Sequence, residues 1–392
     1  MDTLKIKISK PAETIDSLIK AAIESRASDI HFEPERDGFE IRFRIDGILH
    51  PIKVLNIDTQ EQITSRIKIL SHMDIMEHRL PKDGHFEVPY KNLLYNIRVS
   101  TLPGVYGESI VFRIHNSQEV INKIEELGLE PDQLILLKDV MRNPSGMILV
   151  TGPSGSGKTN LIYSMLNYLS SDEKNIITLE DPVECQIKNL RQTSINNDQG
   201  LTFALAMRSV LRQDPDILML GEIRDGETAL LAIQASLSGI LLFSTFHTFD
   251  LPALVNRLTE MGVSRSIVAQ SLRSIISIRL VRRICNKCKE KIVPTKEQKA
   301  LLPSHMVSNV FYRGRGCDAC QHLGYLGRTG VFEIIDIDDE IRANIFDSKS
   351  SIFMLDLLKK KNIMNLKTAA FKKVEAGITT IDEVLRVTGY LK

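Results

Sequence analysis

The length, composition and charge of this chain are those of an ordinary globular protein. Its 392 residues suffice for about two or three domains, and 43% hydrophobic with 25% charged residues exclude a largely disordered chain. A net charge of +1 gives no electrostatic reason to expect direct nucleic-acid binding. The N-terminal residues lack the apolar core of a signal peptide, so the protein is expected in the cytoplasm.

The N-terminal part of the chain is predicted to form a small α+β domain. Apolar residues at helical spacing over 15–22 indicate a helix, and the alternation over 39–45 indicates a half-buried strand. Asp46-Gly47 then predicts a tight hairpin. Further strands are expected at 95–99 and 109–114.

The next part of the chain alternates apolar strands with segments long enough for crossover helices, which predicts a largely parallel sheet. Nucleotide sites in such sheets lie at the carboxyl ends of the strands. The strand candidates are 147–150, 176–179, 217–220 and 240–243.

One uncharged run, 229–246, is long enough to raise a membrane-spanning interpretation. Polar residues and Gly239 interrupt it. A buried helix that ends near Gly239, followed by a buried strand, fits the pattern better.

The most informative segment, 152–159, satisfies the phosphate-loop pattern G-x-x-x-x-G-K-[ST] between an apolar strand and a helix pattern. Lys158 is expected to reach the β and γ phosphates of ATP, and the Thr159 hydroxyl to ligate Mg²⁺. A glycine-rich turn without a ligand is the alternative. The predicted nucleotide contacts are Gly152, Pro153, Ser154, Gly155, Ser156, Gly157, Lys158, Thr159 and Asn160.

Acidic side chains follow the second strand of the predicted sheet. Glu180, Asp181 and Glu184 come at or just after its carboxyl end, where Mg-ATP would lie. Such acids hold metal-bound water or orient an attacking water, and Glu180 is the predicted magnesium contact. Helix capping is the alternative role.

The third and fourth strands supply two more candidates. Glu222 follows 217–220 in a Walker B type position, where a carboxylate polarises the attacking water. A solvated glutamate is the alternative. His247 follows the fourth strand and is predicted to sense or stabilise the γ phosphate, with a structural role as the alternative.

Two arginines, Arg208 and Arg212, are four residues apart and so share one face of a predicted helix. Their guanidinium groups are suited to one anionic target, such as a γ phosphate bound by a neighbouring subunit. A solvated or salt-bridged face is the alternative.

Four of the five cysteines form two C-x-x-C pairs with 28 residues between the pairs. Cys285, Cys288, Cys317 and Cys320 are predicted to bind a structural Zn²⁺ tetrahedrally. Two disulfides are the alternative, which a reducing cytoplasm disfavours, and a redox C-x-x-C would not need a second copy. Cys185 is expected to be a small buried residue.

Seven blocks of this sequence resemble the secretion and pilus ATPases of the type II secretion and type IV pilus assembly systems. The resemblance covers about residues 14–392, and the blocks stand in the order that the family has. They are 28–34, 41–47, 79–84, 152–159, 178–184, 211–216 and 221–225.

The resemblance implies an α/β fold and a homo-hexameric ring. A smaller α+β, PAS-like domain would close over nucleotide bound to a RecA-like P-loop domain with a mainly parallel sheet, and a zinc-binding and helical region would follow. The tetracysteine module, which retraction-type pilus motors lack, indicates the secretion or pilus-extension branch. The predicted parts are an N-terminal domain (1–117), a linker (118–130), the ATPase domain (131–283), the tetracysteine module (284–325) and a helical domain (326–392).

Carried over by motif, the resemblance also implies roles for individual residues. Glu184 and Glu222 become the catalytic carboxylates, in an aspartate box over 176–184 and a Walker B box over 217–222. The histidine box ends at His247. The implied γ-phosphate arginines are Arg98, Arg113, Arg208 and Arg212.

The chain departs from the family pattern at three positions. Ile240 stands where the family usually has a histidine, Phe249 replaces an asparagine, and Asn160 replaces a small hydroxyl residue. The first change leaves His247 to act alone in its box. The sequence also begins close to the conserved N-terminal domain, so either a longer docking extension lies outside it or this member docks differently.

The sequence therefore predicts a Mg²⁺-dependent, ATP-hydrolysing hexameric motor that powers protein secretion at the cytoplasmic face of an inner-membrane platform. Type IV pilus assembly is the alternative. A motor for DNA uptake or conjugation and a small-molecule kinase are further alternatives, which the zinc module or the phosphate loop permits.

Overall fold

The computed structural model describes residues 10–116, 121–248, 250–303, 306, 310–347 and 351–389. Phe249 and residues 117–120, where the predicted linker begins, lie outside these ranges. The chain divides into two compact units. The first comprises residues up to 120 with 285–289 and 314–327, and the second comprises 121–284, 290–313 and the chain from 328 onward.

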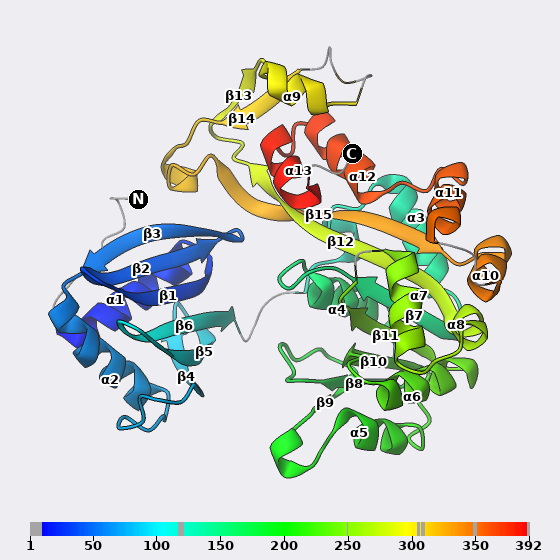
Figure 1. Ribbon diagram of the computed structural model, residues 1–392, viewed down its shortest axis with the longest axis horizontal. Helices are drawn as coiled ribbons and strands as arrows, with labels where there is room; N and C mark the ends of the chain where they lie inside the picture. The colour runs from blue at the N-terminus through cyan, green and yellow to red at the C-terminus, as the bar shows by residue number, and fades with distance from the viewer. Residues whose placement is uncertain are drawn as a thin grey trace. The chain divides into compact units, whose positions relative to one another are not determined.

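The first unit is built on a six-stranded antiparallel sheet. Its elements are α1 (Pro11–Glu24), β1 (Ala27–Glu35), β2 (Gly38–Ile45), β3 (Ile48–Leu55), α2 (Gln60–Leu70), β4 (Lys82–Tyr90), β5 (Leu93–Gly104) and β6 (Gly107–Asn116). The strand order is β3-β2-β1-β6-β5-β4 (Figure 1). Alternate strand residues, among them Phe32, Phe43 and Phe112, are fully buried in a core shared with α1 and α2. The predicted hairpin is confirmed, since Asp46 and Gly47 between β2 and β3 both have positive φ.

The second unit contains a seven-stranded sheet in the order β15-β12-β7-β11-β10-β8-β9, and the neighbouring strands from β12 to β9 run parallel (Figure 1). The strands are β7 (Gly146–Thr151), β8 (Ile176–Glu180), β9 (Leu190–Ser194), β10 (Ile217–Glu222), β11 (Leu241–Phe246), β12 (Leu272–Ile284) and β15 (Tyr325–Asp336). The predicted apolar strands are β7, β8, β10 and β11. The predicted α/β fold with a mainly parallel sheet is thus confirmed.

Helices cover both faces of this sheet. They are α3 (Pro131–Met141), α4 (Lys158–Leu169), α5 (Phe203–Val210), α6 (Gly226–Leu237), α7 (Leu251–Glu260), α8 (Arg265–Ser271), α10 (Asp339–Phe346), α11 (Ser351–Lys360), α12 (Leu366–Glu375) and α13 (Ile381–Thr388). Ile148 and Val150 of β7 share a core with α3 and α4, whereas Met147 and Leu149 share the opposite core with α6 and α8. We call the face of the sheet that packs against α3 and α4 the α4 face. A short pair, β13 (Lys289–Ile292) and β14 (Phe311–Gly314), flanks α9 (Lys296–Leu301).

The uncharged run 229–246 folds as most of α6 followed by β11, as predicted. Among the residues that the structure describes, no helix is both long and apolar enough to cross a membrane.

The C-terminal region holds a strand, β15, in addition to its helices. A buried ion-pair cluster attaches α13 to β12. Glu383, whose side chain is fully buried, accepts hydrogen bonds from Nη2 of Arg282 (2.8 Å) and Nε of Arg386 (2.9 Å). Burial acts to raise the pKa of Glu383, but these arginines lower it to about 2.

Candidate functional site

The phosphate loop joins β7 to α4, and its glycines hold positions that a side chain could not share. A Cβ on Gly152 would lie 2.5 Å from the Ser156 hydroxyl oxygen and 2.7 Å from the carbonyl oxygen of Ile278. Gly157 has a φ of 91°, in the left-handed region that favours glycine, directly before the first residue of α4. The backbone therefore turns from strand to helix within the motif, as phosphate loops require.

Two polar groups are buried in this loop. The Nζ of Lys158, a residue only 8% exposed, donates to the carbonyl oxygens of Gly152 (2.8 Å) and Pro153 (3.0 Å). Burial lowers the pKa of Lys158, and the nearby Arg279 lowers it further. The Ser156 hydroxyl oxygen is buried and has no hydrogen-bond partner within the described part of the chain. A buried cation and an unpartnered hydroxyl beside a helix N-terminus fit an anionic ligand such as a phosphate.

A β-bulge at the end of β10 sets the direction of Glu222. Leu220 pairs with Ser244 of β11 and Glu222 pairs with Thr245, so two residues of β10 oppose one residue of β11. Because side chains alternate along a strand, Glu222 would otherwise share the face of Leu220. The bulge places Glu222 beside Thr245 instead, on the α4 face of the sheet.

Glu222 lies close to three charged or titratable groups. Nη2 of Arg224 donates to one of its carboxylate oxygens, and Nη1 of Arg224 is 3.9 Å from Oδ2 of Asp181. Nε2 of His247 is 3.8 Å from the other oxygen of Glu222. Glu222 also acts to raise the pKa of Lys158, against the larger effect of burial. The structure thus brings together Lys158, Glu222 and His247.

Protein donors surround the carboxylate of Glu180, a residue only 3% exposed. The Thr178 hydroxyl (2.5 Å) and Nε2 of Gln192 (3.2 Å) donate to Oε1, and the Tyr163 hydroxyl donates to Oε2. The same Tyr163 oxygen accepts a hydrogen bond from the backbone N–H of Glu184 (3.3 Å). Glu180 and Glu184 are therefore linked through Tyr163.

The two arginines of the second unit lie together near the end of α5. This helix ends at Val210, so Arg212 follows it. Nη1 of Arg212 donates to the carbonyl oxygen of Arg208 (2.7 Å), and the Arg208 guanidinium pairs with Glu227 of α6. Both guanidinium groups thus have protein partners here.

The two arginines of the first unit, Arg98 and Arg113, lie directly opposite each other on β5 and β6. Nε of Arg113 donates to Oδ1 of Asp29 (3.0 Å). Burial, together with the two arginines, lowers the pKa of His115 to about 4, so this imidazole is neutral at pH 7. Because Ile97 and its neighbours on the strands fill the core, the two arginines lie on the opposite face of the sheet, where Asp29 also lies.

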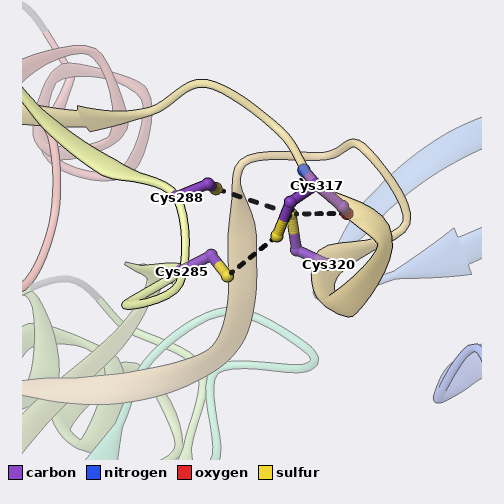
Figure 2. Close-up of side chains that lie close together, drawn as sticks. All are labelled: Cys285, Cys288, Cys317 and Cys320. Carbon is purple, nitrogen blue, oxygen red and sulfur yellow. Dashed lines mark hydrogen bonds between the residues drawn. The ribbon is translucent and has the colours of Figure 1, made fainter.

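Figure 2 shows the four cysteines of the two C-x-x-C pairs gathered in one cluster. Sulfur separations include 3.9 Å between Cys285 and Cys317 and 3.8 Å between Cys288 and Cys320. Four thiolates placed tetrahedrally about 2.3 Å from one zinc ion would be about 3.8 Å apart, so the spacing fits zinc. Backbone N–H groups of Cys317 and Gly324 donate to Sγ of Cys320, and although burial acts to raise its pKa, hydrogen bonds lower it to about 7.

No disulfide joins any of the five cysteines, all of which lie in the described part of the chain, so the disulfide alternative does not describe this structure. Cys185, predicted to be buried, is partly exposed. That prediction is wrong because Cys185 lies between β8 and β9, outside the sheet.

Three residues near the site had no role in the sequence prediction: Tyr163, Gln192 and Arg224. A signal for Tyr163 and Gln192 was present in the strand with which the aspartate box begins. Thr178 and Glu180 are two residues apart in an apolar strand, so both lie on one face of it, and a buried carboxylate there requires donors from neighbouring elements.

A glycine loop between a parallel strand and a helix, with carboxylates at the ends of neighbouring strands, defines a P-loop nucleotide-binding domain. Residues 8–386 match the protein family described as "Type II/IV secretion system protein". The chain belongs to this family.

Two relatives illustrate the range of the family. The chain is 39% identical over 388 residues to the type IV pilus assembly ATPase PilB of Thermus thermophilus, covering 98% of this chain and 44% of that protein. It is 40% identical over 374 residues to the type II secretion system protein E of Dickeya dadantii, covering 95% and 75%. The chain therefore spans less than half of the first relative and three quarters of the second.

Two solved structures share the fold. The ATPase DotB of Legionella pneumophila superposes with a TM-score of 0.70 at 20% identity, over 97% of both chains. The pilus retraction motor PilT with bound ADP gives a TM-score of 0.61 at 24% identity, over 94% of this chain and 95% of that one. At these identities the likeness concerns the fold alone.

Proposed function

We propose that this chain hydrolyses ATP and drives movement in a secretion or pilus assembly machine, with type II secretion as the first candidate system. The observation that carries the ATPase proposal is the buried Lys158 of the phosphate loop with Glu222 turned toward the α4 face beside it. Type II secretion is supported by relatives of that name at 38–40% identity, which the chain covers over about three quarters of their length.

The residues of the site have distinct proposed roles. Bound ATP would supply the phosphoanhydride bond, and Mg²⁺ held by Thr159 would neutralise charge on the phosphates. Lys158 would exchange its bonds to loop carbonyl oxygens for bonds to phosphate oxygens. Glu222 would accept a proton from the attacking water, with His247 beside it to contact the γ phosphate. The magnesium contact of Glu180 stays a prediction.

We further propose that the protein acts as a homo-hexamer. Arg98, Arg113, Arg208 and Arg212 would stabilise the γ phosphate, some of them across a subunit boundary, and Glu184 would serve as a second catalytic carboxylate. The ring would work at the cytoplasmic face of an inner-membrane platform. Mass in solution, measured with and without a nonhydrolysable ATP analogue, tests the assembly; a monomer under both conditions would contradict it.

Phosphate release from ATP without any added acceptor tests the ATPase proposal. Lys158→Ala should lose nucleotide affinity, whereas Lys174→Ala, at an exposed lysine of the same unit, should not. Release only with a small-molecule acceptor would favour a kinase instead. Stimulation by DNA with a steep salt dependence would favour a DNA motor.

Metal analysis of the purified protein tests the zinc proposal. Cys288→Ser should lose zinc, whereas Cys185→Ser, outside the cluster, should retain it. Protein without zinc and with four freely titratable thiols in the cluster would contradict the proposal.

Disruption of the gene in its host tests the choice of system. If type II secretion is the right system, exported enzymes should accumulate in the periplasm while surface pili persist. Loss of pili with normal secretion would establish the pilus alternative.

A further inference from the structure

Tyr163 connects two parts of the candidate site that are distant in sequence. It lies on α4, the helix that begins at Lys158, and its hydroxyl reaches the end of β8. That hydroxyl donates to Oε2 of Glu180 and accepts from the backbone N–H of Glu184 (3.3 Å). Since a phenol has a single proton, its one donor bond is committed to Glu180.

Gln192 of β9 makes a second connection to the same segment. Its Nε2 donates both to Oε1 of Glu180 (3.2 Å) and to the carbonyl oxygen of Cys185 (2.9 Å). Its Oε1 accepts from the backbone N–H of Ile187 (2.7 Å). Two side chains, both bonded to Glu180, therefore hold three backbone groups of residues 184–187.

The network is buried at its centre. Tyr163 is 4% exposed, Glu180 is 3% exposed and Thr178 is fully buried. Burial and the hydrogen bond to Glu180 raise the pKa of Tyr163, so its hydroxyl keeps its proton at neutral pH. A fully bonded polar network in such a place rigidifies the groups that it joins.

The segment that carries Glu184 has no regular secondary structure of its own. Residues 181–189 form the connection between β8 and β9, so no helix or strand bonds fix their backbone. A misplacement of a reacting group by about 1 Å is enough to cost a hundredfold in rate. An external support for this backbone is therefore expected wherever Glu184 takes part in the chemistry.

We propose that Tyr163, Glu180 and Gln192 are positioning residues that fix the backbone of Glu184 relative to the phosphate-loop helix. The inference rests on the proposed role of Glu184 as a catalytic carboxylate. It gives Glu180 the role of an anchor for this segment, in competition with the predicted magnesium contact, because three protein donors occupy most of the lone-pair sites on its two oxygens.

Tyr163→Phe tests the inference by removing one oxygen while it keeps the ring. We expect kcat to fall about 10- to 100-fold. The affinity for a nonhydrolysable ATP analogue and the Mg²⁺ concentration for half-maximal rate should change less than about threefold, because the hydroxyl bonds Glu180 and the backbone of Glu184 and is proposed to act only through them. In a Glu184→Gln background the same substitution should change the residual single-turnover rate less than about twofold, since its effect passes through Glu184.

Gln192→Ala provides a second test from the edge strand β9, in case Tyr163→Phe lowers the yield of folded protein. It should show the same fall in kcat with unchanged nucleotide affinity. The matched control is Ser236→Ala, which removes a buried hydroxyl that donates to the carbonyl oxygen of Ile233 within α6 (2.8 Å). Its kcat should equal that of the wild type.

Three results would overturn the inference alone. The first is a normal kcat in both Tyr163→Phe and Gln192→Ala. The second is a Tyr163→Phe substitution that lowers the rate of Glu184→Gln by the same factor as it lowers the wild-type rate. The third is a Mg²⁺ requirement raised tenfold or more in Tyr163→Phe. Full activity of Glu184→Gln itself would instead overturn the proposed role of Glu184, and with it the basis of the inference.

Discussion

The ends of β8 and β10 each carry a glutamate at the same edge of one parallel sheet, yet the two carboxylates have opposite surroundings. Glu180 is 3% exposed and accepts hydrogen bonds from three side chains. The Glu222 side chain is 23% exposed and has Arg224 and His247 beside it. A general base needs an accessible lone pair within hydrogen-bond reach of the attacking water. The strand end thus locates both carboxylates, whereas burial and the number of donors distinguish the roles that we propose for them.

The largest effect should come from Glu222→Gln, which keeps the shape of the side chain and removes its basicity. We expect kcat to fall about 10³-fold while ATP binding persists, because general base catalysis is worth about 10²- to 10⁴-fold. Phosphate release and analogue binding measure the two quantities. Glu260→Gln, at an exposed glutamate of α7, is the control. Wild-type turnover in Glu222→Gln would show that Glu222 is not the general base.

Glu180→Ala should act on stability, because it leaves the donors of Tyr163, Thr178 and Gln192 without their shared acceptor. We expect the free energy of unfolding to fall by about 3 kcal/mol, since each buried unpaired donor costs about 1 kcal/mol or more. Urea unfolding measures it. Glu222→Ala, at the more exposed carboxylate, should lose less than about 1 kcal/mol. Equal losses of unfolding free energy in Glu180→Ala and Glu222→Ala would show that burial does not set the contribution of these two carboxylates to stability.

Glu383 is a third buried or partly buried carboxylate, far from the candidate site along the chain, and its partners are arginines. Although burial opposes it, hydrogen bonds from Arg386 and Arg282 lower its pKa from 4.5 to about 2. A lowered pKa in the folded state stabilises the protein above about pH 4.5, and this contribution is lost as the pH falls toward 2. Glu383→Gln should therefore lower the free energy of unfolding by about 2 kcal/mol at pH 7.

The pH series is the measurement for Glu383. Urea unfolding of the wild type and Glu383→Gln at pH 7, 4 and 3 should give a difference that shrinks below pH 4.5. A difference that stays constant with pH would show that the stability gained from the bonds of Arg282 and Arg386 does not depend on the charge of Glu383.

The smallest effect is expected from Arg224→Ala. Its side chain is 60% exposed, and it joins Glu222 to Asp181 at the rim of the site. Exposed ion pairs contribute about 1 kcal/mol or less, which corresponds to about a fivefold change in kcat at most. Arg257→Ala, at another exposed ion pair, should leave kcat unchanged. A loss as large as that of Glu222→Gln would make Arg224 part of the catalytic machinery.

Four of the parallel strands, β7, β8, β10 and β11, and the phosphate loop were predictable from the sequence because their signals are local, whereas the parallel strands β9 and β12 were not predicted. Apolar runs such as 147–150 and 217–220 mark strands buried on both faces, and the glycine spacing marks the loop. β15 was not predicted. Its buried residues, among them Val331 and Ile334, mix with glycine, arginine and threonine, so its sequence shows neither an apolar run nor a clear alternation.

The chemical groups of the site were predictable, but their arrangement was not. Lys158 and Glu222 follow from motifs, whereas the bonds of Glu180 depend on which side chains of α4 and β9 meet it across the sheet. Such meetings are set by tertiary packing. Periodicity alone does not show them.

At the end of β10, the number of residues decides which face of the sheet the Glu222 carboxylate lies on. Gly221 is the extra residue of the bulge, and it sends the Glu222 carboxylate to the α4 face. A protein that lacked this one residue would keep every functional group of the motif, but the carboxylate would enter the layer that contains α5 and α6. A single deletion here would therefore act as a loss-of-function change even though no side chain of the motif is altered.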